Sequence, residues 1–168
     1  ALDSVWRLVT PNKALGLTGV RAAYAIAPRD ANAALLARVR LLAPSWPLGA
    51  HGVALLQAWA RDEVHDWLLA CRDSLRLWKA RQMALLTGIG WQVQPSDANF
   101  FVAARACPSS AGGLFDSKAG LDDLRAQGFK LRDCASFGLP GRVRMAVVAP
   151  EVQDALVSAL LTKAQEAA

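Results

Sequence analysis

Strand-like and helix-like segments are interleaved along the 168 residues, and this order predicts a mixed fold of the α/β or the α+β class. Apolar residues make up 54% of the chain and charged residues 20%, so a packed core is expected and general disorder is not. The length suits about one domain, but the pattern changes near residues 70–90. We therefore expect a layered first part over residues 1–72, the start of a long connecting helix, and a compact second domain over residues 73–168.

The first part is expected to hold two strands and two helices before the long one. Asp30 is the expected N-cap of the first helix, and Pro44 is expected to end it. The expected elements are a buried strand over 4–9, a second strand over 20–27, and helices over 31–42 and 48–60.

A longer helix is expected over residues 62–86, because apolar side chains recur there at steps of three and four. The members of this stripe are Val64, Leu68, Cys71, Leu75 and Trp78. Gly88 and Gly90 are expected to end the helix.

Beyond the long helix the period changes to that of strands. Gly128 is expected to end a short helix, and Pro150 suits the first turn of the last one. The expected elements are strands over 91–95, 99–104, 129–134 and 142–147, a loop over 108–113, and helices over 120–127 and 150–165.

Charge and cysteine content narrow the class of partner. A net charge of +5 suits anionic partners, but no run of five Lys or Arg exists, so nucleic acid is not expected. No apolar run reaches the roughly 18 residues of a membrane span.

Three widely spaced cysteines, Cys71, Cys107 and Cys134, predict neither a disulfide framework nor a zinc site, so a reducing cytoplasm is expected. The start of the chain lacks the pattern of a signal peptide, and we expect that an upstream portion is missing.

One lysine in an apolar, glycine-punctuated segment is a candidate nucleophile. A lysine amine attacks a carbonyl only when neutral, and its ordinary pKa is about 10.4, so apolar surroundings or a nearby cation are needed. Lys13 has apolar neighbours, and Arg21 lies eight positions on. Thr10 and Arg21 could hold a phosphate while Lys13 forms a Schiff base with an aldehyde. The alternative from spacing alone is a solvated lysine and a surface arginine flanking a turn.

This segment, TPNKALGLTGVRAAYAI at residues 10–26, resembles the cofactor-lysine segment of fold-type I pyridoxal-phosphate enzymes. It is most similar to the branch that holds histidinol-phosphate aminotransferases and threonine-phosphate decarboxylases. The resemblance implies that Lys13 is the catalytic residue that carries pyridoxal 5'-phosphate, and that Arg21 binds the cofactor phosphate. Pro11 and Asn12 depart from the pattern, which often has small hydroxyl residues there. The positions in register are Thr10, Lys13, Gly16, Gly19, Arg21 and Tyr24.

A second segment, LRDCASFGLPGRVRMAV at residues 131–147, resembles the substrate-arginine segment of the same family. Two strands joined through the 137–141 turn could direct Arg132 and Arg144 to one cleft, whose natural ligands are carboxylate and phosphate. The resemblance implies that Arg144 binds the substrate's α-carboxylate and that Arg132 helps to hold its phosphate. Arg142 could be a further contact, and a surface role remains open for each arginine.

Together these resemblances imply the C-terminal part of a fold-type I enzyme: a remnant of the large cofactor-binding α/β domain, the linking helix and the small α+β domain. They also imply a homodimer and a small phosphorylated amino-acid substrate, with no nucleic acid, membrane or metal. His51 and His65 are expected to be structural, since neither has a partner at metal-ligand spacing.

The amino-acid sequences of both segments resemble those of the threonine-phosphate decarboxylases of cobalamin biosynthesis, which form aminopropanol phosphate, more than those of histidinol-phosphate aminotransferases. An aminotransferase is the first alternative. A non-catalytic fragment or binding module is the second, because the chain lacks the upstream half in which the family keeps other cofactor contacts.

Overall fold

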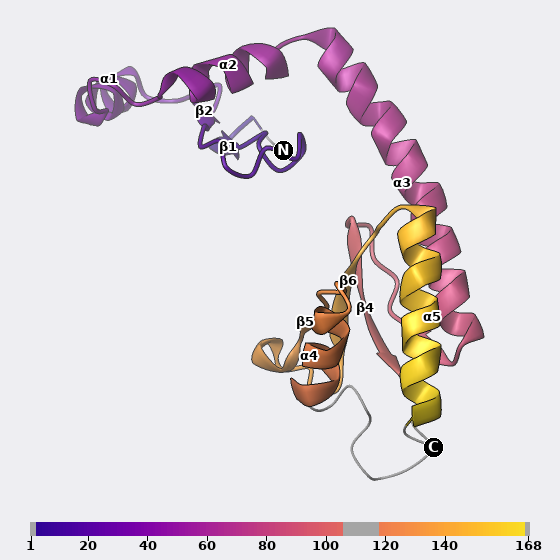
Figure 1. The fold of residues 1–168 in the computed structure, drawn as a ribbon. Coiled ribbons are helices and arrows are strands. Elements are labelled where there is room, and N and C mark those ends of the chain that lie inside the picture. The colour runs from indigo at the N-terminus through magenta and orange to yellow at the C-terminus, as the bar shows by residue number, and fades with distance from the viewer. Residues whose placement is uncertain (1–2, 106–117, 167–168) are drawn as a thin grey trace. The chain divides into compact units, whose positions relative to one another are not determined.

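The computed structural model describes residues 3–105 and 118–166 and separates into two compact units, Ala1–Cys71 and Arg72–Ala168 (Figure 1). Groups of strands and groups of helices follow one another along the chain, as the predicted mixed class requires. Cys107 and the loop expected over 108–113 lie outside the described residues. The interpretation of the two units as parts of a larger enzyme's domains stays a prediction.

The first unit contains a two-stranded antiparallel ribbon formed by β1 (Arg7–Val9) and β2 (Tyr24–Ile26). The prediction that the first strand is buried is wrong for this chain, because Leu8 is 78% exposed. The reason is that β1 pairs with β2 alone among the described strands, so no further strand of the described residues flanks the ribbon.

Two helices follow the ribbon, α1 (Ala33–Leu42) and α2 (Ala50–Trp59). The expected N-cap of α1 was wrong by two residues: Asn32, not Asp30, accepts hydrogen bonds from the backbone N–H groups of Ala34 and Leu35 at 2.8 and 3.3 Å. An N-cap oxygen must reach the second or third helical N–H, and Asp30 is too far upstream to do so.

The long helix is α3 (Asp62–Gly88), which begins where the sequence predicts and continues two residues further. The predicted stripe is its less exposed side: Leu68 is buried and the other four members are half-buried. Gly90, with φ of 82°, then takes the left-handed conformation that lets the chain turn into the next strand.

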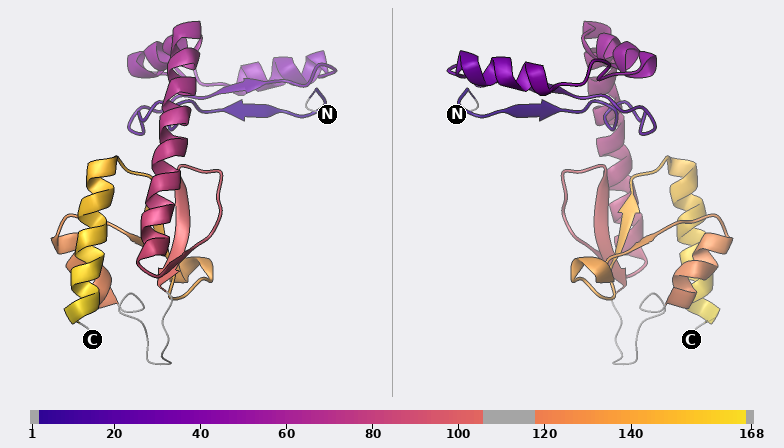
Figure 2. Two further views of the ribbon diagram at one scale, coloured as in Figure 1. Left: turned by 90° about the vertical axis from the view of Figure 1, so that its right-hand side faces the viewer. Right: turned by 90° about the vertical axis from the view of Figure 1, so that its left-hand side faces the viewer.

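The second unit is built on a four-stranded antiparallel sheet in the order β3-β4-β6-β5. Figure 2 shows its two central strands, β4 and β6, from opposite sides. Its strands are β3 (Trp91–Val93), β4 (Phe100–Arg105), β5 (Arg132–Asp133) and β6 (Val143–Ala146). The helices are α4 (Lys118–Ala126) and α5 (Pro150–Glu166), with a short 3-10 helix, η1 (Ala135–Phe137), between β5 and β6.

Strand β5 is shorter than the six residues expected. Gly128, with φ of 92°, ends α4, and the N–H of Phe129 still donates to the carbonyl of Leu124 at 2.8 Å. Phe129 and Leu131 then pack against the core cluster, so pairing with β6 begins only at Arg132.

Helices α3, α4 and α5 all contribute to a core on one face of this sheet. Alternate residues of the central strands face it, as a two-residue period requires. The core side chains are Leu86, Trp91, Phe101, Ala103, Leu124, Val143, Met145, Leu156, Ala159 and Leu160. The residues between them in β4 and β6, such as Phe100 and Arg144, therefore lie on the opposite face and are exposed.

A buried glutamine fixes the end of β6 to α3. The Gln82 side chain is 1% exposed, donates to the carbonyl of Ala146 at 3.1 Å, and accepts from the N–H of Val148 at 3.1 Å. Because both polar ends of this amide are paired, its burial holds the strand in register at little cost.

Candidate active site

Lys13 lies in a compact turn between β1 and β2. The N–H of Leu15 donates to the carbonyl of Pro11 at 3.1 Å, and the N–H of Leu17 donates to the carbonyl of Asn12 at 2.8 Å. Gly16 adopts φ of 69°, which only glycine takes without strain, and this lets the turn close. Pro11 and Asn12 are buried beneath the turn, whereas Lys13 itself is exposed.

The structure brings the predicted residues Thr10, Lys13 and Arg21 together around one hollow of about 550 Å³. Thr10 directly follows β1, and Arg21 lies three positions before the first residue of β2, so the pairing of the two strands places both ends of the loop side by side. The lining residues are Thr10, Asn12, Lys13, Arg21, Ala22, Ala23, Pro47 and Leu48.

The chemistry of this lining is that of an anion site. It offers an amine, a guanidinium, a hydroxyl and an amide, and it includes no carboxylate. Neither Lys13 nor Arg21 forms an ion pair within the residues that the structure describes. Both side chains are therefore available to a ligand.

A close approach of α2 supports the arginine end of the hollow, and the sequence alone did not indicate it. A Cβ added at Gly52 would lie 3.1 Å from the carbonyl oxygen of Arg21 and 3.4 Å from the Cβ of Ala22. Glycine at this position therefore lets the helix pack against the segment that carries Arg21. The signal that could have found it is a glycine inside a helix, which usually has a packing reason.

The region beside the hollow is tied together by an aromatic group. The indole N–H of Trp59 donates to the hydroxyl of Tyr24 at 3.2 Å. His65 Nε2 lies 2.8 Å from the carbonyl oxygen of Trp59, and its ring is 4.6 Å from the Trp59 ring. These contacts join the end of α2 to β2 and to the start of α3.

In the second unit, Arg132 and Arg144 lie directly opposite each other on β5 and β6. Arg144 is also opposite Val102 on β4, so all three share the face of the sheet that carries no core residue. Each guanidinium lies over an aromatic ring: Arg144 is 4.9 Å from the centre of Phe100, and Arg132 is 5.5 Å from the centre of Phe137. Sequence reasoning missed both phenylalanines.

Like charges directly opposite each other weaken a strand pair, so this arrangement has a structural cost. In the described part of the chain neither arginine has a carboxylate partner to offset it. Such a pair is well suited to one dianionic ligand or to two anionic groups of one ligand. Arg142 precedes β6, and its carbonyl accepts the N–H of Cys134 at 3.0 Å.

Cys134 lies next to this pair but is not an exposed nucleophile. It is 2% exposed, and burial raises the pKa of its thiol above the ordinary value, although Arg144 and Arg132 act in the opposite direction. A neutral, buried thiol packs as a small apolar side chain.

Two negative findings concern the described residues, 3–105 and 118–166. They contain no group of three or more side chains able to hold a metal ion. They also contain no helix of the length and apolar character needed to cross a bilayer.

A family model described as aminotransferase class I and II matches residues 5–160. The chain belongs to this family. Its members depend on pyridoxal phosphate, so the family and cofactor predicted by resemblance are confirmed.

Some similar proteins are named aminotransferases and others are named decarboxylases. A histidinol-phosphate aminotransferase from Ruegeria pomeroyi is 31% identical over 149 residues, which are 88% of this chain and 37% of that protein. A solved decarboxylase from Sulfurospirillum multivorans matches with a TM-score of 0.72 at 24% identity, over 93% of this chain and 42% of that one. L-threonine-O-3-phosphate decarboxylase from Porphyromonas gingivalis gives 0.60 at 20% identity, over 95% and 46%.

At these identities the two decarboxylase structures show the fold alone, and with it they bear out the predicted fold class. The chain spans about two fifths of the length of the curated relatives it matches. The residues around Lys13 fit pyridoxal phosphate, because the carboxylate-free hollow offers an amine for its aldehyde and a guanidinium and hydroxyl for its phosphate.

Proposed function

We propose that the protein to which this chain belongs is a pyridoxal-phosphate-dependent lyase that decarboxylates L-threonine O-3-phosphate to aminopropanol phosphate in cobalamin biosynthesis. The observation that carries the cofactor part is the convergence of Thr10, Lys13 and Arg21 on one hollow. The opposed pair Arg132 and Arg144 carries the substrate part, since this substrate has both a phosphate and a carboxylate.

In this proposal Lys13 holds the aldehyde carbon of the cofactor, and Thr10 and Arg21 hold its phosphate. When bound, pyridoxal phosphate supplies an electron sink for the pair of electrons released as a bond to the substrate's Cα breaks. Arg144 binds the carboxylate and Arg132 the phosphate, so the rotation about Cα is set from two ends. Carbon dioxide leaves, and the amine of Lys13 can return a proton to Cα.

A histidinol-phosphate-type aminotransferase is the second candidate. It is favoured by the names of sequence relatives such as the Ruegeria pomeroyi protein. In that reaction the Lys13 amine removes the proton from Cα instead, and the same two arginines bind the phosphate of one substrate and the carboxylate of the amino donor. The two reactions differ in which bond to Cα breaks, the bond to the carboxylate or the bond to hydrogen, and the two arginines would set this by holding the anionic groups of the substrate.

The first experiment tests whether Lys13 carries the cofactor at all. The full-length protein is incubated with pyridoxal phosphate and reduced with borohydride, and the labelled peptide is identified by mass. We expect the label on Lys13, its loss in Lys13→Arg, and its retention in the control Lys130→Arg. A full-length protein that takes no label, or takes it elsewhere, refutes the enzymatic proposal and leaves a non-catalytic fragment or binding module.

The second experiment separates the two reactions. The decarboxylase proposal requires carbon dioxide from L-threonine O-3-phosphate. Formation of glutamate from 2-oxoglutarate and histidinol phosphate, without carbon dioxide from the first substrate, would establish the aminotransferase instead.

We also infer a homodimer in the reducing cytoplasm. The dimer follows from what is typical of the family, and the compartment from the absence of a disulfide pattern in the sequence. Light scattering of the full-length protein tests the first point.

A further inference from the structure

We propose that Phe100 and Phe137 are positioning residues, each of which holds one of the two opposed guanidiniums in place for an anionic ligand. This inference rests on the proposed function, because it gives the arginine pair a substrate to bind. It adds a role to two residues that neither the sequence motifs nor the arginines' own chemistry assigned.

The arginines need an external restraint. They lie directly opposite on β5 and β6, so their like charges drive the side chains apart. A carboxylate neighbour would hold a guanidinium but would also occupy the N–H donors that a substrate needs. Among the described residues neither arginine forms an ion pair with a carboxylate, and the carboxylate of Asp133, which follows Arg132 in the chain, instead accepts the N–H of Ala135.

An aromatic ring restrains a guanidinium without using its donors. The ring attracts the cation through its negative face and leaves the N–H groups at the guanidinium edge available. The Arg144–Phe100 and Arg132–Phe137 separations, 4.9 and 5.5 Å, both lie within the reach of about 6 Å for this interaction. The two rings are 37% and 57% exposed, so neither is held there by burial in the core.

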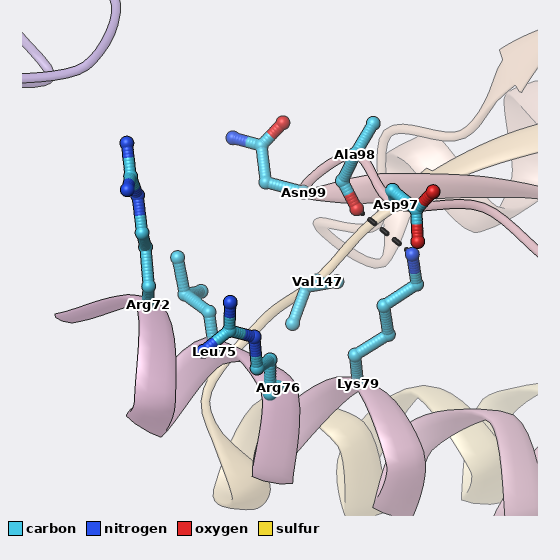
Figure 3. Close-up of a pocket in the computed structure, with 8 residues that line it drawn as sticks. All are labelled: Arg72, Leu75, Arg76, Lys79, Asp97, Ala98, Asn99 and Val147. Atoms are coloured by element: carbon cyan, nitrogen blue, oxygen red, sulfur yellow. Dashed lines mark hydrogen bonds between the residues drawn. The ribbon is translucent and has the colours of Figure 1, made fainter. Parts of the chain in front are cut away.

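Phe100 is set by a braced loop at the start of β4. Lys79, on α3, donates to the carbonyl of Ala98 at 2.9 Å and also to that of Ser96, as Figure 3 shows for the first of these. The Ser96 hydroxyl donates to the carbonyl of Phe100 at 2.8 Å, and the carbonyl of Asn99 accepts the N–H of Val147 at 3.0 Å. The backbone on both sides of the Phe100 side chain is therefore fixed.

Phe137 is set by a different device, the turn between β5 and β6. The Asp133 carboxylate accepts the N–H of Ala135 at 2.9 Å, and the N–H of Phe137 donates to the carbonyl of Cys134 at 2.9 Å. Gly138, with φ of 74°, ends the short helix immediately after it. Since the two rings depend on separate segments, the two arginines can be perturbed one at a time.

This separation makes the proposal testable with two truncated ligands of the full-length enzyme. L-threonine has the carboxylate but no phosphate, and aminopropanol phosphate has the phosphate but no carboxylate. Phe100→Leu should raise the inhibition constant of L-threonine about two- to fivefold and leave that of aminopropanol phosphate unchanged, and Phe137→Leu should do the reverse. Phe100→Tyr and Phe137→Tyr, which keep the aromatic face, should restore the parent values.

Each substitution is thereby the control for the other. Equal shifts for both ligands in either variant, or no shift in either, would overturn the positioning role. A second measurement does not need turnover: the ring current of Phe100 should displace the Nε–H resonance of Arg144, and Phe100→Leu should remove that displacement. If the parent protein neither turns over nor binds these ligands but Phe100→Leu still shifts the Arg144 resonance, the proposed function fails while the stacking stands. If Phe100→Leu leaves that resonance unmoved, the stacking itself is refuted.

Discussion

Lys79 gives the sharpest test of how the second unit is held together, because Arg76, about one helical turn away on α3, provides a matched control. Its amine donates to the two carbonyls of the 95–99 loop, those of Ser96 and Ala98. Lys79→Met keeps most of the side-chain volume and removes both hydrogen bonds. Arg76→Met removes an exposed ion pair with Asp73, whose two side chains are 75% and 73% exposed.

The expected magnitudes differ clearly. A hydrogen bond that involves a charged group contributes about 1.5–3 kcal/mol to stability. Lys79 and Ala98 both line a hollow through which water can reach them, so we take the lower end for each hydrogen bond and expect a loss of about 3 kcal/mol for Lys79→Met. An exposed ion pair three residues apart on a helix contributes about 0.2–0.5 kcal/mol, which sets the expectation for Arg76→Met.

Urea unfolding followed by tryptophan fluorescence measures both losses, and Trp91, at 3% exposure, is a buried probe within the same unit. Lys79→Met should also weaken the binding of L-threonine more than Arg76→Met does, since the loop that it braces carries Phe100. A loss below about 1 kcal/mol for Lys79→Met, or equal losses for the two variants, would show that these hydrogen bonds do not brace the loop.

Two further predictions concern the cofactor hollow and the buried thiol. Gly52→Ala should weaken pyridoxal phosphate binding to the full-length protein, because its added methyl meets the Arg21 carbonyl at 3.1 Å. The control Gly49→Ala, whose methyl meets nothing within 4 Å, should leave the affinity unchanged. Equal affinities of the two variants in a fluorescence titration would refute the close contact. The pKa of Cys134 is raised by burial above its ordinary 9.0, so the unfolded chain releases the thiol proton first. The stability that it contributes is complete below pH 9.0 and is lost as the pH rises through the folded value, and Cys134→Ala should flatten that alkaline loss in unfolding curves taken from pH 8 upward.

Much of the architecture could be predicted from local pattern. The stripe on α3, the stop at Gly88 and Gly90, and the glycine after α4 are short-range signals, and the helices lie close to where those signals place them. The wrong predictions concern features that residues outside the local pattern decide, such as the N-cap of α1. Asp30 and Asn32 are both good capping residues, and only the start of the helical backbone at Ala33 selects between them.

The candidate site shows the same division. The residue types of Thr10, Lys13 and Arg21, together with the resemblance of their segment to the cofactor-lysine segment, were sufficient to nominate them as a group. Phe100 and Phe137 could not be found in this way, because Phe100 is far from Arg144 along the chain and a phenylalanine in or beside a strand is ordinary.

The amino-acid sequence alone determined the order of helices and strands, because that order depends on residue type at short spacing. Its resemblance to fold-type I enzymes, not local pattern, indicated the family and the cofactor. The tertiary structure decided the rest: the pairing of β5 with β6 places Arg132 opposite Arg144, and the loop braced by Lys79 places the Phe100 ring beneath the Arg144 guanidinium. These two contacts join residues 12 and 44 positions apart, and their geometry is set by strand register and by which face of the sheet the helices cover. No local pattern encodes either of these, because both emerge only when the whole unit packs.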